Sequence, residues 1–330
     1  MTIHTHPTSD SKTLPPTQAL AQFVAAARTA GYDARSLHRA RYHTLDTLGA
    51  SLAASGLDAT NKAADTLVRC GASGDTPVPG RSERFSVLDA AFVAGTAGHG
   101  LELDDGYRAG SVHPGTVVVP AALAAAHAAG CDGARFVQAI VAGYEVICRL
   151  SAAIHPRARW RGFHNTPVTG VFGAAAVWAV IHDFDAAQVE DAFGAACSQA
   201  GGLFTFLQGG EVKRTHPGFG ARAGLLSGAL VSEGLSGPPG CLESPNGFFH
   251  AYAGGDDAGL DYTAIDILGA GKGSPLAMTE CYIKPHACCR HIHGPIDALQ
   301  SLMREHELAA KDIAGIHVGT YKVAAAHDLP

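Results

Sequence analysis

The sequence of 330 residues contains little charge for its length. Only 16% of the residues are Asp, Glu, Lys or Arg, whereas about a quarter is usual in a soluble domain. With so few charges, much of the chain must face other protein, which indicates a large core and an exterior partly covered in an oligomer. The formal net charge is −6 and no basic run occurs. Both observations argue against binding to nucleic acid.

The sequence also lacks signals for secretion and membrane insertion. Residues 1–16 are polar and contain proline, without the apolar segment of a signal peptide. The longest apolar stretch, residues 168–181, is too short to span a bilayer. The eight cysteines are mostly isolated within apolar runs, and without a secretory signal this is typical of reduced thiols. We therefore expect a cytoplasmic protein without a membrane partner.

Motifs that hold nucleotides, metals or an activated serine are absent as well. The chain contains no phosphate-binding loop, no G-x-G-x-x-G fingerprint, no G-x-S-x-G turn and no iron–sulfur cysteine spacing. Cysteines and histidines gather between Cys281 and His293, but the adjacent Cys288 and Cys289 cannot readily share one tetrahedral zinc site. We expect neither a metal nor an organic cofactor, so the chemistry must depend on side chains alone.

Apolar periodicity predicts a mainly α-helical chain. Helices rich in Ala and Gly are expected at residues 20–27, 37–55, 59–69, 86–98, 117–129, 134–154, 169–182, 186–200 and 221–233. Several are apolar nearly all round, which is typical of helices inside a large bundle. Ser86 followed by Asp89 indicates a capping box at one helix start. Residues 71–81 predict a surface loop, and no β-alternation is convincing before residue 279.

The character of the sequence changes near residue 270. Residues 269–275 form a glycine-rich joint, residues 278–283 could be a strand, and a helix is expected over 295–306. Apolar residues between 316 and 323 then indicate a β-rich segment. We predict a loose leader over residues 1–16, a large all-helical domain over 17–269 and the beginning of a smaller α+β lid domain over 270–330.

Polar clusters interrupt the apolar helices, and the first of them is acidic. Glu102, Asp104 and Asp105 lie within four positions and repel one another, so an external cation or exposure to water would relieve them. A solvated helix end is the alternative interpretation. His113 precedes Pro-Gly at a helix start, where backbone N–H groups favour anions. A substrate carboxylate docked there would lie beside a group that titrates near neutral pH.

Two further clusters combine histidine with cationic residues. His164 precedes an apolar helix, and a single histidine at such a position is more often structural than catalytic. Lys213, Arg214 and His216 follow a pair of glycines, which lets the backbone approach a ligand closely. A basic surface turn is the alternative interpretation of this segment.

The densest cluster covers residues 284–293. Lys284 and Arg290 would form an anion pocket, whereas Cys289 beside Arg290 could instead be an activated thiol. Together the clusters supply carboxylates, imidazoles and cations from distant segments. These are the groups needed to hold a small polyacid and to move its protons.

These clusters resemble the signature of the MmgE/PrpD family. The resemblance rests on residues 89–105 with His113-Pro114, on Phe163-His164, on Lys213-x-x-His216-x-Gly218 with residues 221–224, on Gly247-Phe248-Phe249 and on Lys284-Pro285-x-x-Cys288-Cys289-Arg290-x-x-His293. The segments occur in the family's order and cover nearly all of residues 17–330. The family includes 2-methylcitrate dehydratase, cis-aconitate decarboxylase and iminodisuccinate epimerase. The resemblance implies a large helical domain with a smaller α+β lid, no cofactor and a homodimer.

Carried over by position, the resemblance also implies a set of site residues. The catalytic set would be Glu102, His113, His164 and Lys213, and the substrate contacts Asp104, Asp105, His216, Lys284, Cys289 and Arg290. Glu102 replaces the first aspartate of the family's pattern, and Cys289 stands where cis-aconitate decarboxylases have a histidine. The second departure disfavours decarboxylation of cis-aconitate. Because family members are longer, the chain is expected to be a fragment or a truncated product.

The resulting hypothesis is a cofactor-free lyase acting on a di- or tricarboxylic acid, such as a 2-methylcitrate-like substrate. It would remove water after abstracting a proton next to a carboxylate. His113 or His164 would take the proton, and the other histidine or Glu102 would return it or protonate the leaving hydroxyl. Lys213, Arg290 and Lys284 would hold carboxylates and stabilise the developing charge. An epimerase or isomerase of an amino- or imino-dicarboxylate would share the first step. A truncated, non-catalytic scaffold is the third interpretation.

Overall fold

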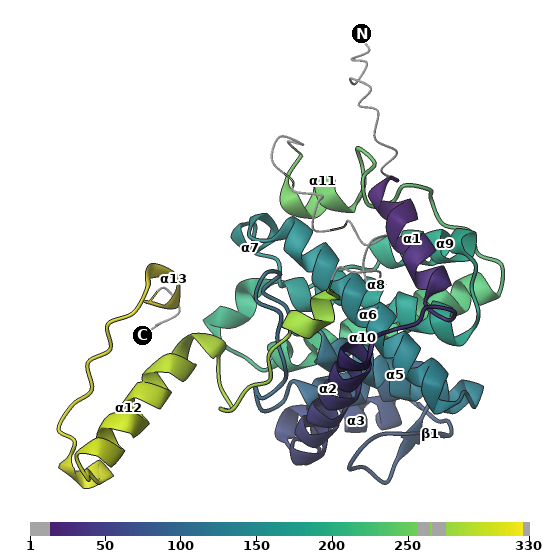
Figure 1. The fold of residues 1–330 in the computed structure, drawn as a ribbon. Helices are drawn as coiled ribbons and strands as arrows, with labels where there is room; N and C mark the ends of the chain where they lie inside the picture. Colours follow the sequence, from purple (N-terminus) through teal and green to yellow (C-terminus); the bar gives the residue numbers. More distant parts are fainter. Residues whose placement is uncertain (1–13, 256–259, 261–264, 266–274, 326–330) are drawn as a thin grey trace.

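Long apolar helices build the body of the molecule (Figure 1). The computed structural model describes residues 14–255, 260, 265 and 275–325. Helix α8 (Asn165–Ile181) is buried along its length, and α6 (Gly133–Ile154) and α10 (His216–Ser232) pack against it. Helices α4 (Val87–Gly98) and α5 (Gly115–Ala129) complete this core. The prediction of a mainly α fold is confirmed.

Glycines let two of these helix pairs approach closely. An added Cβ atom on Gly224 of α10 would lie 2.2 Å from the carbonyl oxygen of Val171 in α8. An added Cβ on Gly218 would lie 2.3 Å from the carbonyl oxygen of Phe92 in α4. A methyl group at either position would force backbones apart, because protein interiors are already close-packed. The second contact therefore fixes the start of α10 against the middle of α4, the helix that precedes the acidic cluster.

Shorter elements surround this core. They are α1 (Pro16–Ala26), α2 (Ala34–Ala53), α3 (Asp58–Arg69), α7 (Arg157–Trp160), α9 (Ala186–Cys197), α11 (Phe248–Ala253) and the 3-10 turns η1 (Phe204–Gln208) and η2 (Val212–Thr215). Every predicted helix of this region is present, with ends shifted by a few residues. The Ser86 hydroxyl accepts a hydrogen bond of 3.2 Å from the backbone N–H of Asp89 and donates to the Asp89 carboxylate at 2.9 Å, so Ser86 caps the helix as predicted, although the reciprocal backbone bond of a capping box is not among its contacts.

A small hairpin corrects the prediction of a strand-free helical region. Strands β1 (Thr76–Pro77) and β2 (Arg84–Phe85) pair antiparallel, with Thr76 opposite Phe85. Each strand has two residues, too few to show the alternation of apolar and polar residues on which strand prediction depends. The surface loop predicted at residues 71–81 therefore contains one strand of this hairpin.

The C-terminal segment also differs from the predicted strands. Residues predicted as a strand at 278–283 instead include the 3-10 turn η4 (Ala277–Glu280), and Tyr282 makes only an isolated bridge to Gly106. Residues 315–321 belong to no strand. A strand needs a neighbouring edge for its backbone hydrogen bonds, and the described part of the chain pairs none with these residues. The other elements of this segment are η5 (Arg290–Ile292), α12 (His293–Glu305), η6 (Ala310–Asp312) and α13 (Lys322–Ala325).

Helix α12 confirms the helix predicted at 295–306, and together with α13 it extends away from the helical body (Figure 1). We call residues 284–325 the C-terminal arm. The predicted joint at 269–275 falls almost entirely on residues outside the described part of the chain, as does most of the predicted leader. The boundary between a helical domain and a lid stays a prediction.

Helix α6 is long and apolar enough to cross a membrane by length and composition alone. In its most apolar window, however, 78% of the residues are buried inside the protein. Its buried side chains contact α8 and α5. This is the arrangement expected of a central core helix.

Candidate active site

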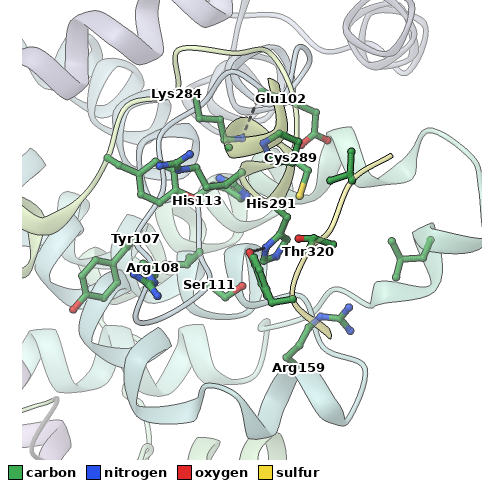
Figure 2. A pocket seen from close by; sticks show the side chains of 18 of the residues that line it. Glu102, Tyr107, Arg108, Ser111, His113, Arg159, Lys284, Cys289, His291 and Thr320 are labelled. Atoms are coloured by element: carbon green, nitrogen blue, oxygen red, sulfur yellow. Dashed lines mark hydrogen bonds between the residues drawn. The ribbon is translucent and has the colours of Figure 1, made fainter. Parts of the chain in front are cut away.

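A cavity of about 1170 Å³ lies between the helical body and the C-terminal arm. It collects side chains from the loop after α4, the start of α8, the turns η1 and η2, and the arm (Figure 2). The predicted site residues that line it are Glu102, His113, His164, Lys213, Lys284, Cys289 and Arg290. The other three, Asp104, Asp105 and His216, are buried and do not line it. The structure thus brings together side chains that lie far apart in the sequence, from Glu102 to Arg290.

Cationic side chains contact both the carboxylate and the backbone carbonyl oxygen of Glu102. Its carboxylate pairs with Lys213 and accepts a hydrogen bond of 2.6 Å from Arg214, and its carbonyl oxygen accepts one of 2.9 Å from Lys284. Its φ angle of 55° is left-handed, a strained conformation that such contacts can maintain. Burial opposes ionisation, but His99 and Lys213 outweigh it and lower the pKa of Glu102 to about 2. Glu102 is therefore a carboxylate near neutral pH.

Asp104 lies below the cavity floor and organises its basic residues. Its carboxylate is 2.8 Å from Nδ1 of His99, 3.5 Å from Nδ1 of His113 and 3.7 Å from the ammonium nitrogen of Lys284. Burial opposes ionisation, but these three neighbours hold the pKa of Asp104 well below its usual range. Because the side chain is fully buried, the interpretation of Asp104 as a direct substrate contact does not fit the structure. It is a positioning residue.

Asp105 joins three elements of the fold. One carboxylate oxygen accepts a hydrogen bond of 2.9 Å from the backbone N–H of Gly115, and the other accepts one of 2.8 Å from the Tyr144 hydroxyl. The second oxygen also lies 2.9 Å from Nδ1 of His43. The side chain is fully buried, and its lone pairs are used within the protein. The prediction that Asp105 contacts substrate does not fit this arrangement, because no face of it reaches the cavity.

His113 has a defined tautomer. Its Nδ1 lies 2.7 Å from the backbone carbonyl oxygen of Asp105, and a carbonyl oxygen can only accept, so Nδ1 carries the proton. Nε2 is then an acceptor in the neutral ring. Burial lowers the pKa of His113 to about 4, with Lys284 and His99 adding to the effect and Asp104 opposing it. The ring is 21% exposed and lines the cavity, so it presents a neutral basic nitrogen to a ligand.

His164 and His216 form a second imidazole pair. Their Nδ1 atoms lie 2.9 Å apart, so one ring donates a proton to the other. Burial, followed by His99 and His216, lowers the pKa of His164 well below its usual range, and burial lowers that of His216 to about 4. Phe204 and Phe206 meet the His164 ring edge-on, with centroids at 5.1 and 5.2 Å. His216 supports His164 from behind rather than contacting the cavity.

The arm supplies the remaining predicted residues. Lys284 is buried between Glu102 and Asp104, whereas Cys289 and Arg290 are exposed at the cavity mouth. The Arg290 guanidinium lies over the ring of Tyr282, 5.4 Å from its centroid. Within the described residues, no group of three or more His, Cys, Asp and Glu side chains is placed to hold a metal ion. A cofactor-free site stays a prediction.

Sequence reasoning missed several side chains of the cavity wall, among them Arg159 and Tyr282. Arg159 belongs to the four-residue helix α7, where no motif marked it, and its guanidinium lies 3.5 Å from the centroid of the Phe204 ring. Tyr282 was interpreted as part of a strand, yet its ring lines the cavity beneath Arg290. A periodicity argument could not find either residue, because both lie in short irregular segments.

The fold and the site define a helical protein whose cavity contains imidazoles, cations and a carboxylate, the groups suited to acid–base chemistry on an anion. A model of the MmgE/PrpD N-terminal domain matches residues 18–261. The chain belongs to the MmgE/PrpD family, as the sequence motifs predicted.

Curated relatives point the same way. The chain is 30% identical to a cis-aconitate decarboxylase-like protein, oryM, of Aspergillus oryzae over 88% of its own length and 62% of the relative's. It is 30% identical to the cis-aconitate decarboxylase of Aspergillus terreus over 82% and 56%, and 28% identical to that of Homo sapiens over 66% and 46%. The chain thus spans less than two thirds of the length of these relatives.

The histidine pKa values predict how stability depends on pH. An unfolded histidine titrates near pH 6.5, whereas folding lowers the pKa of His113 and of His216 to about 4. Between these values the unfolded chain binds more protons than the folded one, so the free energy of unfolding should fall as the pH drops from about 6.5 to 5. Asp46, whose pKa burial raises to about 6, acts in the opposite direction but is one group.

Urea unfolding at several pH values measures this dependence. His216→Gln should make the free energy of unfolding less sensitive to pH in this window, because one depressed histidine is removed. His127→Gln is the matched control, since His127 is exposed on α5 and does not line the cavity. An unchanged pH dependence in His216→Gln would contradict the assignment of a buried neutral imidazole.

Proposed function

We propose that this chain forms the active site of a lyase that removes water from a polycarboxylic acid, such as a 2-methylcitrate-like substrate. Membership of the MmgE/PrpD family and the names of the relatives support lyase chemistry. The observation that supports the proposal is the state of His113. Its imidazole is neutral with the proton on Nδ1, and cationic side chains line the cavity around it. Such a group is a proton acceptor, poised to remove an acidic C–H proton next to a carboxylate.

The reaction that we assign begins with a carboxylate of the substrate bound among the cations of the cavity. His113 Nε2 takes the α-proton, and the electron pair of the C–H bond moves into an enediolate that nearby cations stabilise. The pair then forms a carbon–carbon double bond, while the C–O bond to the β-hydroxyl breaks and the hydroxyl leaves as water. The ring of His113 ends as an imidazolium and returns its proton to solvent.

The leaving hydroxyl needs a proton donor. Glu102 is ionised above a pH of about 2, and the low pKa of His164 keeps that ring neutral, so neither can readily give up a proton near neutral pH. We assign this role to the Lys213 ammonium, which lies in the cavity wall paired with Glu102 and which regains a proton from solvent after the product leaves. Glu102 would hold Lys213 in place, and His164 would orient the hydroxyl by a hydrogen bond.

Decarboxylation is the second candidate, because the relatives are named cis-aconitate decarboxylases. In that reaction a carbon–carbon bond breaks, CO₂ leaves and the remaining carbanion takes a proton. Such a site needs a proton donor at carbon, whereas the pKa of about 4 leaves the His113 ring neutral near pH 7, without a proton on Nε2 to give. Epimerisation of an amino- or imino-dicarboxylate would share the base but would return the proton to the opposite face.

Product analysis distinguishes these reactions. Citrate, 2-methylcitrate, cis-aconitate and iminodisuccinate are incubated separately with the full chain, and the products are followed by NMR. The proposal expects loss of water from a hydroxy acid. Release of CO₂ from cis-aconitate alone would replace dehydration by decarboxylation, and epimerisation alone would favour the isomerase. No reaction with any of the compounds would favour a non-catalytic scaffold.

We also propose that the chain forms a homodimer in the cytoplasm. The low charge of the sequence supports an interface, and large apolar side chains are exposed on α2, namely Tyr42, Leu45 and Leu52. Analytical ultracentrifugation at micromolar concentration should give twice the chain mass. A monomer mass at this concentration would contradict the dimer.

A further inference from the structure

Two arginines in the cavity are stacked on aromatic rings. The Arg159 guanidinium lies 3.5 Å from the centroid of the Phe204 ring, and that of Arg290 lies 5.4 Å from the centroid of the Tyr282 ring. No ion pair with a carboxylate is recorded for either arginine among the described residues. A guanidinium over the face of a ring can still direct its N–H groups at the two oxygens of a carboxylate.

The lysines of the cavity are engaged differently. Lys213 is paired with Glu102, and Lys284 donates to the carbonyl oxygen of Glu102 and faces Asp104. Acidic side chains therefore already offset much of the positive charge of both lysines. Among the described residues, Arg159, Arg290 and the exposed Arg108, which also lines the cavity, have no such carboxylate partner, so their charges remain available to an anionic ligand.

Arg159 occupies a distinct part of the cavity. Figure 2 shows it at the edge of the pocket opposite Glu102 and Lys284, on the helical body rather than on the arm. Phe204, on which it stacks, also meets the His164 ring edge-on at 5.1 Å. The guanidinium is thus only one aromatic ring beyond His164. A substrate group that extends past His164 would meet Arg159.

Local packing holds Arg159 in this place. Phe204 packs against Phe206 with ring centroids at 4.8 Å, and both rings contact His164. Burial lowers the pKa of Arg159, but arginine titrates so far above neutral pH that the side chain stays a cation. A half-buried cation that is pre-oriented by stacking loses little side-chain freedom on binding a carboxylate.

We infer that Arg159 is a specificity residue that binds a second, distal carboxylate of the substrate. The substrate class is then a tricarboxylate, or a dicarboxylate whose second acid group extends away from the reacting carbon. This inference rests on the proposed function, since it assumes that the cavity binds a polycarboxylic acid. It adds a residue of the helical body that discriminates among such acids.

Two probes with the same carbon skeleton test the inference. Tricarballylate is propane-1,2,3-tricarboxylate, and methylsuccinate is propane-1,2-dicarboxylate, which lacks one terminal carboxylate. Titration calorimetry with the full chain should show tighter binding of tricarballylate. In Arg159→Met the affinity for tricarballylate should fall about 10–100-fold, the usual effect of losing a charge-assisted hydrogen bond, while that for methylsuccinate stays unchanged. Arg159→Lys should recover part of the loss, because lysine restores the positive charge but lacks the paired N–H groups of the guanidinium.

Arg161→Met is the matched control, since Arg161 follows α7 and donates to the carbonyl oxygen of Ala251 rather than lining the cavity. It should bind both probes as the parent does. Unchanged tricarballylate affinity in Arg159→Met, or an equal loss for both probes, would overturn the role of Arg159 while leaving the proposed function intact. A parent protein that binds neither probe would instead contradict the polycarboxylate function on which the inference rests.

Discussion

Replacing His113 by glutamine should reduce proton abstraction from the substrate by about 10²–10⁴-fold, the usual contribution of a general base. Glutamine is close to histidine in size, and its amide group reaches the position of Nε2, whereas the hydrogen bond of 2.7 Å from Nδ1 to the carbonyl oxygen of Asp105 is lost. The amide has no basic nitrogen, however, and no proton can be taken at the position of Nε2. Exchange of the substrate α-proton with D₂O, followed by NMR, measures the step directly in a preparation whose parent is active.

The matched control is His127→Gln. His127 also lies against a backbone carbonyl oxygen, that of Asp75 at 3.2 Å, but it is outside the cavity. The control should exchange the proton at the parental rate. A His113→Gln variant that exchanges as fast as the control would assign the base to another residue, with His164 as the next to be replaced.

Replacing Asp105 by alanine should lower the free energy of unfolding by about 3–5 kcal/mol, the range for removing one partner of a buried ionic contact. The backbone N–H of Gly115 and the Tyr144 hydroxyl would lose their acceptor in a region closed to water, and His43 would lose the carboxylate that lies 2.9 Å from its Nδ1. These groups belong to α5, α6 and α2, so the loss should loosen the floor beneath the cavity. Urea unfolding measures the change.

Asp132→Ala provides the comparison. Asp132 caps α6 by accepting a hydrogen bond from the backbone N–H of Arg135 at 2.8 Å, but it is exposed. Loss of such a cap usually costs about 1 kcal/mol. If Asp105→Ala were no more destabilising than Asp132→Ala, Asp105 would not be the internal anchor described above, and a role at the substrate would have to be considered again.

The helical framework could be predicted because it depends on local pattern. Apolar periodicity and small residues predicted α4 to α6 and α8 to α10, and the Ser86 cap followed from one hydroxyl before a helix start. The same local reasoning predicted strands in the C-terminal segment, but the described residues there form none. Apolar residues between 316 and 323 suit a strand, but a strand also requires a partner edge, which a local pattern cannot reveal.

The sequence predicted which residues belong to the candidate site more reliably than what each of them does there. The acidic cluster, the histidines and the lysines were recognised, yet the sequence gives no indication of which of Glu102, Asp104 and Asp105 faces the cavity. The structure separates them: Glu102 lines it, whereas the two aspartates are buried among their own partners. Arg159, in contrast, was not recognised at all. Its candidate role depends on its contact with Phe204, which lies in a different segment, and no spacing in the sequence predicts that contact.

The most direct test of the proposed function is α-proton exchange by the parent protein itself. The full chain is incubated in D₂O with 2-methylcitrate, citrate and tricarballylate, and the C–H signals next to each carboxylate are followed by NMR. A proton-abstracting polycarboxylate site predicts that at least one of these acids loses α-proton signal faster than in a protein-free sample, and that His113→Gln abolishes the difference. Binding of these acids without any α-proton exchange would contradict the proposal that this cavity acts by proton abstraction.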